Sequence, residues 1–206
     1  MAVVTSYTTL VTAVQDYLAR SDLSTFVPNF IQQWEERFFR NPRNHGAWMD
    51  ATFSDTIASG VVAVPTGFLN WRTVYVDGSS ASRLEQVSPE QLFGRYPRGS
   101  GTGIPRWIAR VGSNFEFGPE PDSDYDIAGT YRAKPTALRS YASDAAAHWM
   151  ILNAPDMLLY GALAEAEAFV KNDSRIAVWK GLYNEALKDY RDLWFEQEMT
   201  SQEVLA

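Results

Sequence analysis

The stretch PDMLLYGALAEAEAFV, residues 155–170, decides how the rest of the chain can fold. It opens with a proline, which the first turn of a helix tolerates because no intrahelical hydrogen bond needs its missing N–H. Alanine, glycine and leucine then occupy nearly every side of the coil, whereas a surface helix needs only one apolar stripe. We therefore expect a helix that packs on several sides, either at the centre of its own bundle or against neighbouring copies as well.

Helical periodicity flanks this stretch at both ends of the chain. Apolar residues recur at helical spacing over residues 6–40, with Ser6 as an N-cap and Pro28 in the first turn of a second helix. Asn41 precedes a proline, which ends that helix. A further helix is expected to begin at Ser143 or Asp144, and a last one follows Asn172-Asp173. The pattern weakens from Met199 onwards, so residues 199–206 are expected to form a tail.

The middle of the chain has the composition of strands. Short segments rich in β-branched and aromatic residues are separated by glycine, proline, serine and asparagine, and residues 125–133, YDIAGTYRA, close the series. A helical turn is expected at residues 88–97. The sequence predicts an α+β fold in which residues 1–46 and 136–206 form one helical bundle. Residues 47–135 form a β-rich insertion, either an antiparallel sheet or a small open barrel.

Composition excludes several kinds of protein. The 206 residues contain no cysteine, which excludes disulfides, thiol catalysis and cysteine-based zinc sites. No apolar run approaches the ~20 residues of a membrane span, and the N-terminus lacks a secretory signal, so we expect a soluble protein that is intracellular when made and has no membrane partner. The net charge of −7 argues against general affinity for nucleic acid, although it suits a surface that DNA slides past.

No residue set predicts a reaction, and we expect no catalytic, cofactor or metal site. His45 and His148 lack partner patterns and are expected to be structural. Glu165 and Glu167 lack the histidines of a di-metal bundle site, so we expect them to be solvated or salt-bridged. The acidic segment 122–126 has calcium-loop spacing, yet the required glycine and the chelating glutamate are missing.

A glycine-rich stretch, RGSGTGIPR at residues 98–106, resembles a phosphate-binding loop only superficially. Prolines precede and follow it where a strand and a helix are required, so we expect an irregular loop. Its arginines Arg95, Arg98 and Arg106 are candidates for contact with DNA or an acidic partner.

The order of these segments resembles the head–tail connector (adaptor) proteins of tailed bacteriophages, including the tail-tube-top adaptors of short-tailed phages. The segments that carry the resemblance are YTTLVTAVQDYLARSDL (7–23), VPNFIQQWEERFFRN (27–41), AWMDATF (47–53), GTYRAKPTAL (129–138) and NAPDMLLYGALAEAEAFVKNDSRIAVWKGLYNEALKDY (153–190). Residues 79–118 match little in that family. The resemblance otherwise covers nearly the whole chain.

The resemblance implies a non-enzymatic ring of twelve copies in the virion neck, assembled in the host cytoplasm. The ring joins the portal protein to a tail or nozzle protein and lets DNA pass without specific binding. Each copy of a closed ring needs two different contact faces. The subunit-interface candidates are Gly161, Ala162, Ala164, Glu165 and Ala168. The portal-docking candidates are Trp194, Phe195, Met199, Val204 and Leu205, and the β-rich insertion is expected to face the tail.

Two other functions stay open on the sequence. Seven tryptophans are compatible with a carbohydrate-binding or decoration protein of the virion, although core packing accounts for most of them. A small metal-dependent hydrolase would have to use Asp122, Asp124 or His45.

Overall fold

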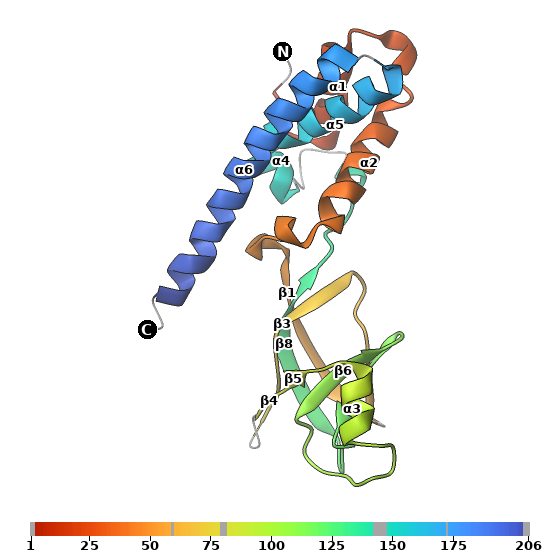
Figure 1. The fold of residues 1–206 in the computed structure, drawn as a ribbon, viewed down its shortest axis with the longest axis vertical. Helices are drawn as coiled ribbons and strands as arrows, with labels where there is room; N and C mark the ends of the chain where they lie inside the picture. The colour runs from red at the N-terminus through yellow and green to blue at the C-terminus, as the bar shows by residue number, and fades with distance from the viewer. Residues whose placement is uncertain (1–2, 59, 79–81, 142–147, 172, 204–206) are drawn as a thin grey trace. The chain divides into compact units, whose positions relative to one another are not determined.

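The chain forms two compact units, one made of Met1–Trp48 with Thr136–Ala206 and the other of Met49–Pro135, in a computed structural model (Figure 1). The structure describes residues 3–58, 60–78, 82–141, 148–171 and 173–203, the side chains of 173 and 196–203 excepted. The first unit is helical, and the second contains every described strand together with helix α3. The predicted mixture of helices with largely antiparallel sheet is thus confirmed at the level of fold class.

Two helices begin the chain, and both start where the sequence predicts. Helix α1 (Tyr7–Leu18) is capped by Ser6, whose side chain accepts a hydrogen bond from the Thr9 N–H in a reciprocal capping box. Helix α2 (Val27–Arg40) has a proline in its first turn and ends at Asn41, whose backbone is extended. The 3₁₀ turns of the chain are η1 (Ser21–Leu23), η2 (Pro42–Asn44), η3 (Ala47–Met49) and η4 (Leu138–Ser140).

The second half of the helical unit contains α4 (Trp149–Asn153), α5 (Pro155–Val170) and α6 (Asp173–Glu203). The helix start expected at Ser143 or Asp144 lies outside the described residues. The predicted tail from Met199 is wrong over its first part, because α6 continues without a break to Glu203. Extending an existing helix requires far less free energy than starting one, so residues of weak pattern continue it.

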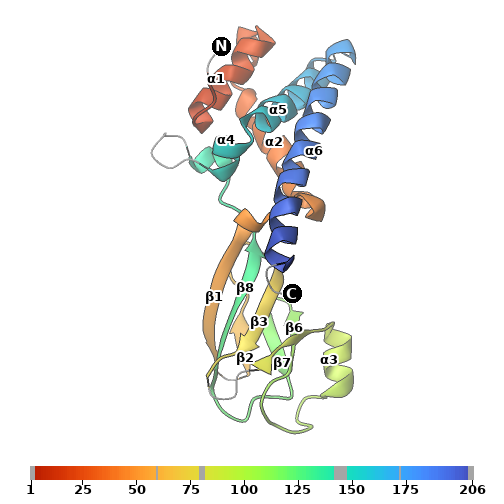
Figure 2. The same cartoon turned by 90° about the vertical axis from the view of Figure 1, so that its left-hand side faces the viewer.

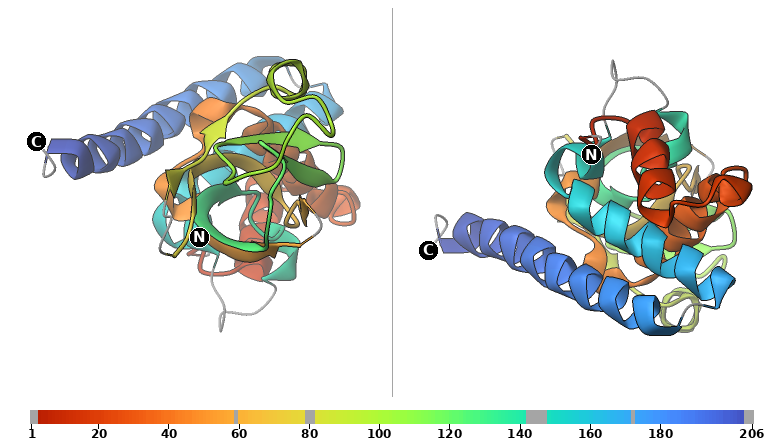
Figure 3. Two further views of the ribbon diagram at one scale, coloured as in Figure 1. Left: turned by 90° about the horizontal axis from the view of Figure 1, so that it is seen from below. Right: turned by 90° about the horizontal axis from the view of Figure 1, so that it is seen from above.

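Helix α5 is the central element of the helical unit. It contacts α1, α2, α4 and α6, and it lies between α1 and α6 when this unit is viewed from above (Figure 3, right). Figure 2 shows α4 at the start of α5, whereas the far end of α5 adjoins the start of α6. Its buried residues are distributed around the coil: Met157, Leu158, Leu159, Gly161, Ala162, Leu163, Ala164, Ala166 and Glu167. Packing on several sides therefore occurs within the chain itself.

A glycine on α5 allows the closest of these approaches. A Cβ atom at Gly161 would collide with the indole ring of Trp34, which reaches across from α2. Trp34 is buried, and its ring lies 5.3 Å from that of Phe38 and 6.2 Å, edge-on, from that of Tyr183 on α6. The indole therefore connects three helices, and only glycine at position 161 leaves room for it.

The β unit contains two four-stranded sheets. The first has the order β1-β8-β3-β4 and consists of β1 (Asp50–Ile57), β8 (Tyr125–Ala133), β3 (Phe68–Val76) and β4 (Ser82–Arg83). The second has the order β2-β7-β6-β5 and consists of β2 (Val61–Ala63), β7 (Asn114–Gly118), β6 (Trp107–Val111) and β5 (Glu85–Gln86). All pairings are antiparallel except β5 with β6.

The parallel pair departs from the expected antiparallel sheet. Strand β5 is followed by α3 (Pro89–Arg95) and by the loop to β6, and this crossover brings the chain back in the same direction. Parallel neighbours require a connection of a dozen or more residues, usually through a helix. The helical turn expected at 88–97 is confirmed, with Ser88 as its cap. It supplies that crossover.

The core of the β unit is largely aromatic. Trp71 lies 5.0 Å from Phe115 and 6.0 Å from Tyr131, measured between ring centroids, and Phe68 packs against all three rings. Gly129 on β8 allows β3 to approach closely, because a Cβ atom there would collide with the Thr73 carbonyl oxygen. These contacts pack β3 and β8 of the first sheet against β7 of the second.

His148 begins α4 and is buried, as expected of a structural histidine. Its Nδ1 accepts a hydrogen bond from the Met150 N–H at 3.2 Å, and its Nε2 is buried with no hydrogen-bond partner among the described residues. Trp48 and Tyr141 pack edge-on against the ring. Burial among these rings disfavours the charged imidazolium and lowers the pKa of His148 from 6.5 to about 4.

Replacing Gly161 by alanine tests the packing at the centre of the helical unit. We expect Gly161→Ala to lower the free energy of unfolding by about 2 kcal/mol, because the overpacked indole has to move. Gly181→Ala on α6 is the matched control, since a Cβ atom there meets nothing within 4 Å. That variant should gain up to ~1 kcal/mol from helix propensity. Denaturant unfolding followed by far-UV circular dichroism measures both, and equal stability of the two variants would contradict the packing.

The low pKa of His148 predicts a loss of stability in acid. The unfolded chain binds a proton on this side chain from about pH 6.5 downwards, whereas the folded chain does so only near pH 4, so folding weakens as pH falls between these values. His148→Asn keeps a helix-capping side chain but cannot titrate. Between pH 7 and pH 4.5 the unmodified chain should lose roughly 2 kcal/mol more than the variant in urea unfolding. Parallel losses in the two proteins would refute the prediction.

Candidate functional site

Among the described residues, the histidines and the acidic segment considered as candidate sites make contacts within the chain. Within the described ranges, no cluster of three or more histidine, aspartate or glutamate side chains could hold a metal ion. In the acidic segment, Asp122 accepts a 2.6 Å hydrogen bond from the Tyr125 hydroxyl. His45 is buried, with Nε2 2.9 Å from the Phe39 carbonyl oxygen. Among the helices described here, none is both long and apolar enough to cross a membrane. The candidate site is therefore sought on interaction surfaces.

The predicted interface residues on α5 divide into two groups. Gly161, Ala162 and Ala164 are buried within the helical unit, so their close packing involves the chain's own helices. Ala168 is exposed, and Glu165 forms an ion pair with Arg37 of α2 at the edge of the packed surface. Contact of these five positions with a neighbouring copy stays a prediction.

Ion pairs hold α5 against its neighbours. The expectation that its glutamates are salt-bridged is confirmed: besides the Glu165 pair, the buried Glu167 lies 3.0 Å from Nε of Arg175 on α6. The Arg175 guanidinium also donates to the Tyr17 carbonyl oxygen at 3.1 Å, which connects α6 to α1. Removing one partner from a buried pair is costly, so Glu167 contributes to a single arrangement of the three helices.

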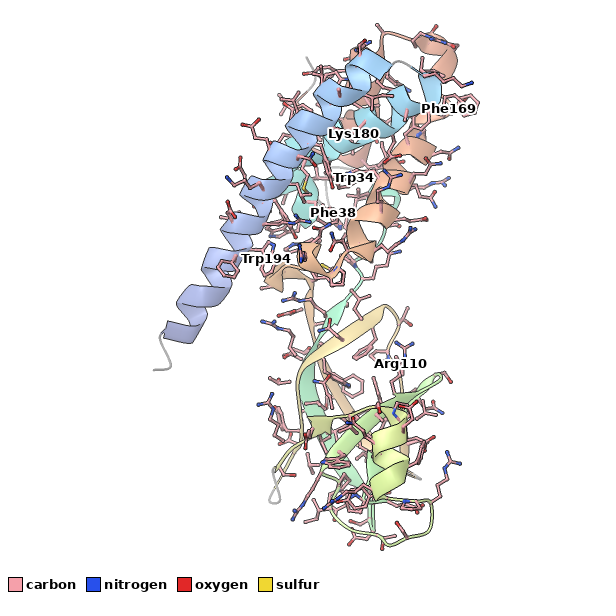
Figure 4. The ribbon with its side chains drawn as sticks, in the orientation of Figure 1. Trp34, Phe38, Arg110, Phe169, Lys180 and Trp194 are labelled. Atoms are coloured by element: carbon pink, nitrogen blue, oxygen red, sulfur yellow. The ribbon has the colours of Figure 1, made fainter. Side chains whose placement is uncertain are left out.

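Both ends of α5 carry exposed apolar side chains that the sequence analysis did not identify. At its C-terminal end, Phe169 is 56% exposed and stacks on Phe26, which is 43% exposed, at 5.6 Å between ring centroids (Figure 4). At the other end, Leu152 of α4 is 64% exposed. Helical spacing alone did not identify these positions, because each lies at a helix end where burial depends on the neighbouring element.

The C-terminal part of α6 carries two exposed apolar side chains, which lie two residues apart and therefore on different sides of the helix. Phe195 is 58% exposed and Leu193 is 46% exposed, whereas Trp194 between them is half-buried (Figure 4). The side chain of Met199 lies outside the described ones, as do residues Val204 and Leu205. Of the five portal-docking candidates, the structure thus describes the side chains of Trp194 and Phe195.

An acidic face runs along the same helix. Glu185, Asp189 and Asp192 are all exposed, and their spacing of four and three residues aligns them on one side of α6. No arginine or lysine follows Arg191 in the sequence. Lys188 is exposed on the same side, so this face carries three negative charges and one positive charge and is acidic overall at neutral pH.

One of the candidate arginines of the β unit, Arg98, lines a cleft of about 450 Å³. Arg98 reaches both carboxylate oxygens of Glu116, at 2.8 and 3.0 Å, and lies over the ring of Phe93. The guanidinium of Arg95 lies 5.7 Å from the centre of the Trp107 ring, and Arg106 is exposed. Arg98 is thus paired with Glu116 although its side chain is 75% exposed, and Arg95 at the end of α3 and Arg106 are exposed as well.

Comparison with known proteins gives the family. No curated protein sequence matches the chain. The sequence model of the SU10 adaptor protein family matches residues 5–203, nearly the whole chain, including the central part that the resemblance left unmatched. Such coverage joins the helical unit and the β unit in one family pattern. The chain therefore belongs to the SU10 adaptor proteins, a phage head–tail adaptor family.

Proposed function

We propose that the chain forms a ring that joins the portal to the tail and prolongs the DNA channel in the virion neck. Family membership implies a structural protein that interacts with other virion proteins. The observation that carries the finer proposal is α6, a helix of 31 residues whose C-terminal part bears exposed Leu193 and Phe195. Each of these side chains is available to pack against a partner that binds the helix.

The portal is the partner proposed for this part of α6. An amphipathic helix binds a groove through apolar side chains at helical spacing, and Trp194, Phe195 and the following residues supply them. The β unit, with Arg95 and Arg106 exposed on its loop, then contacts the tail or nozzle protein. The helices from both ends of the chain act as one bundle that carries the β-rich insertion.

The acidic face of α6 fits a channel through which DNA moves. Glu185, Asp189 and Asp192 would repel phosphates and prevent DNA from adhering as it passes. Twelve copies, the number implied by the resemblance, would repeat this face around the channel. We propose assembly in the host cytoplasm, before the tail is attached.

Carbohydrate binding, one of the two other functions considered, would use the cleft beside Phe93 and Tyr96 in the β unit. Two polar side chains that line that cleft, Arg98 and Glu116, are hydrogen-bonded to each other. A glycan array separates the two functions, because an adaptor gives no sugar signal. Tight binding of a sugar that Glu116→Gln abolishes would favour the alternative.

Substitutions on α6 test the portal contact. The double variant Leu193→Asp/Phe195→Asp should weaken binding to the purified portal of the same phage at least tenfold, since it places two charges in an apolar contact. Val178→Asp, an equally exposed position nearer the start of the helix, is the matched control and should bind like the unmodified chain. Co-sedimentation with portal rings measures both. Undiminished binding of the double variant would show that this part of α6 does not meet the portal.

A further inference from the structure

We propose that neighbouring copies meet head to tail through the two ends of α5, with Leu152 of one copy against Phe26 and Phe169 of the next. The inference rests on the proposed ring and names its subunit contact. This contact does not use the small residues at the centre of α5, because most of them are buried by the chain's own helices.

The first argument is the position of the two apolar surfaces. Leu152 lies three residues before α5 begins, and Phe169 is the last residue but one of that helix. Sixteen residues of helix separate the two ends by about 24 Å. A head-to-tail ring requires two different and complementary surfaces on separate sides of each copy. The two ends of α5 satisfy that requirement within one unit.

The second argument is the shape and chemistry of the surfaces. The stacked rings of Phe26 and Phe169, with Phe30 behind them at 5.4 Å from Phe169, form a flat aromatic patch. Leu152 is a single branched side chain standing almost two-thirds exposed beside half-buried Trp149. Packing of this aliphatic side chain on the aromatic patch would remove apolar surface of both copies from water, which favours association.

The third argument is charge. Asp156 is exposed in the first turn of α5, close in sequence to Leu152, and Lys171 is exposed just past the other end, next to Phe169. When Leu152 meets the aromatic patch of the next copy, Asp156 and Lys171 approach as opposite charges at the rim. Two copies meeting through identical ends would instead place like charges together, so the charges favour the head-to-tail arrangement.

Mixing two variants tests this pairing. Leu152→Asp disables one surface and Phe169→Asp the other, so each full-length variant alone should lose closed rings on the portal, as seen by electron microscopy. Mixed in equal amounts without portal, they should form dimers, because each keeps the surface the other lacks. Analytical ultracentrifugation should then show twice the mass of either variant alone. Val178→Asp is the control and should assemble like the unmodified chain.

A charge exchange gives a second measurement, because Phe169 also packs against Phe26 and Phe30 within the chain. Asp156→Lys and Lys171→Asp should each reduce ring formation several-fold, and a chain with both changes should recover it. A role confined to folding of the single chain would not produce this recovery in ring yield.

The outcomes separate the contact from the ring. If both aspartate variants form rings like the unmodified chain, the contact is wrong and the ring stands. If rings are lost but the mixture yields no dimers, the two surfaces do not meet each other, and the contact is also wrong. If the unmodified chain forms no ring on its portal, the proposed function is wrong. The proposed contact between copies is then wrong as well, because it rests on the ring.

Discussion

The contact between Trp34 and Gly161 is the constraint on which the helical unit depends. The indole occupies the space that any larger residue at position 161 would need, so the side chain of Trp34 on α2 packs directly on the backbone of α5. Tyr183 of α6 packs edge-on against the same indole. Phe38, which also contacts the indole, packs against Tyr190 further along α6. Interiors packed this tightly tolerate few alternative arrangements. This aromatic cluster, together with the ion pair between Glu167 and Arg175, holds α6 against the rest of the helical unit.

This constraint also determines which surfaces remain for partners. Because the sides of α5 are enclosed by α1, α2 and α6, little besides its ends stays accessible, and those ends carry Phe169 and lie next to Leu152. The C-terminal part of α6 retains exposed Leu193 and Phe195 in the same way. The proposed adaptor ring needs separate surfaces for sibling copies and for other virion proteins, and the helical unit provides apolar candidates for both.

The sequence predicted the positions of helices and strands better than it predicted how they pair and pack with one another. The cap at Ser6, the proline-led helix at 155 and the closing strand at 125–133 were predictable because their determinants are local. The parallel pairing of β5 with β6 was not, since it depends on a crossover that brings distant residues together. The exposure of Leu152 and Phe169 was not predictable from the sequence either, because it depends on which helices surround α5. The small residues of α5 indicated dense packing. They did not indicate whether the packing partners would be helices of the same chain or of a neighbouring copy.

The most direct measurement of the central claim is an electron cryo-microscopy reconstruction of the assembled virion neck. The account predicts a closed ring of this chain beneath the portal, in which the C-terminal part of α6 contacts the portal and every copy touches two siblings. Separate copies of the chain that touch no sibling, each bound singly elsewhere on the particle, would contradict it.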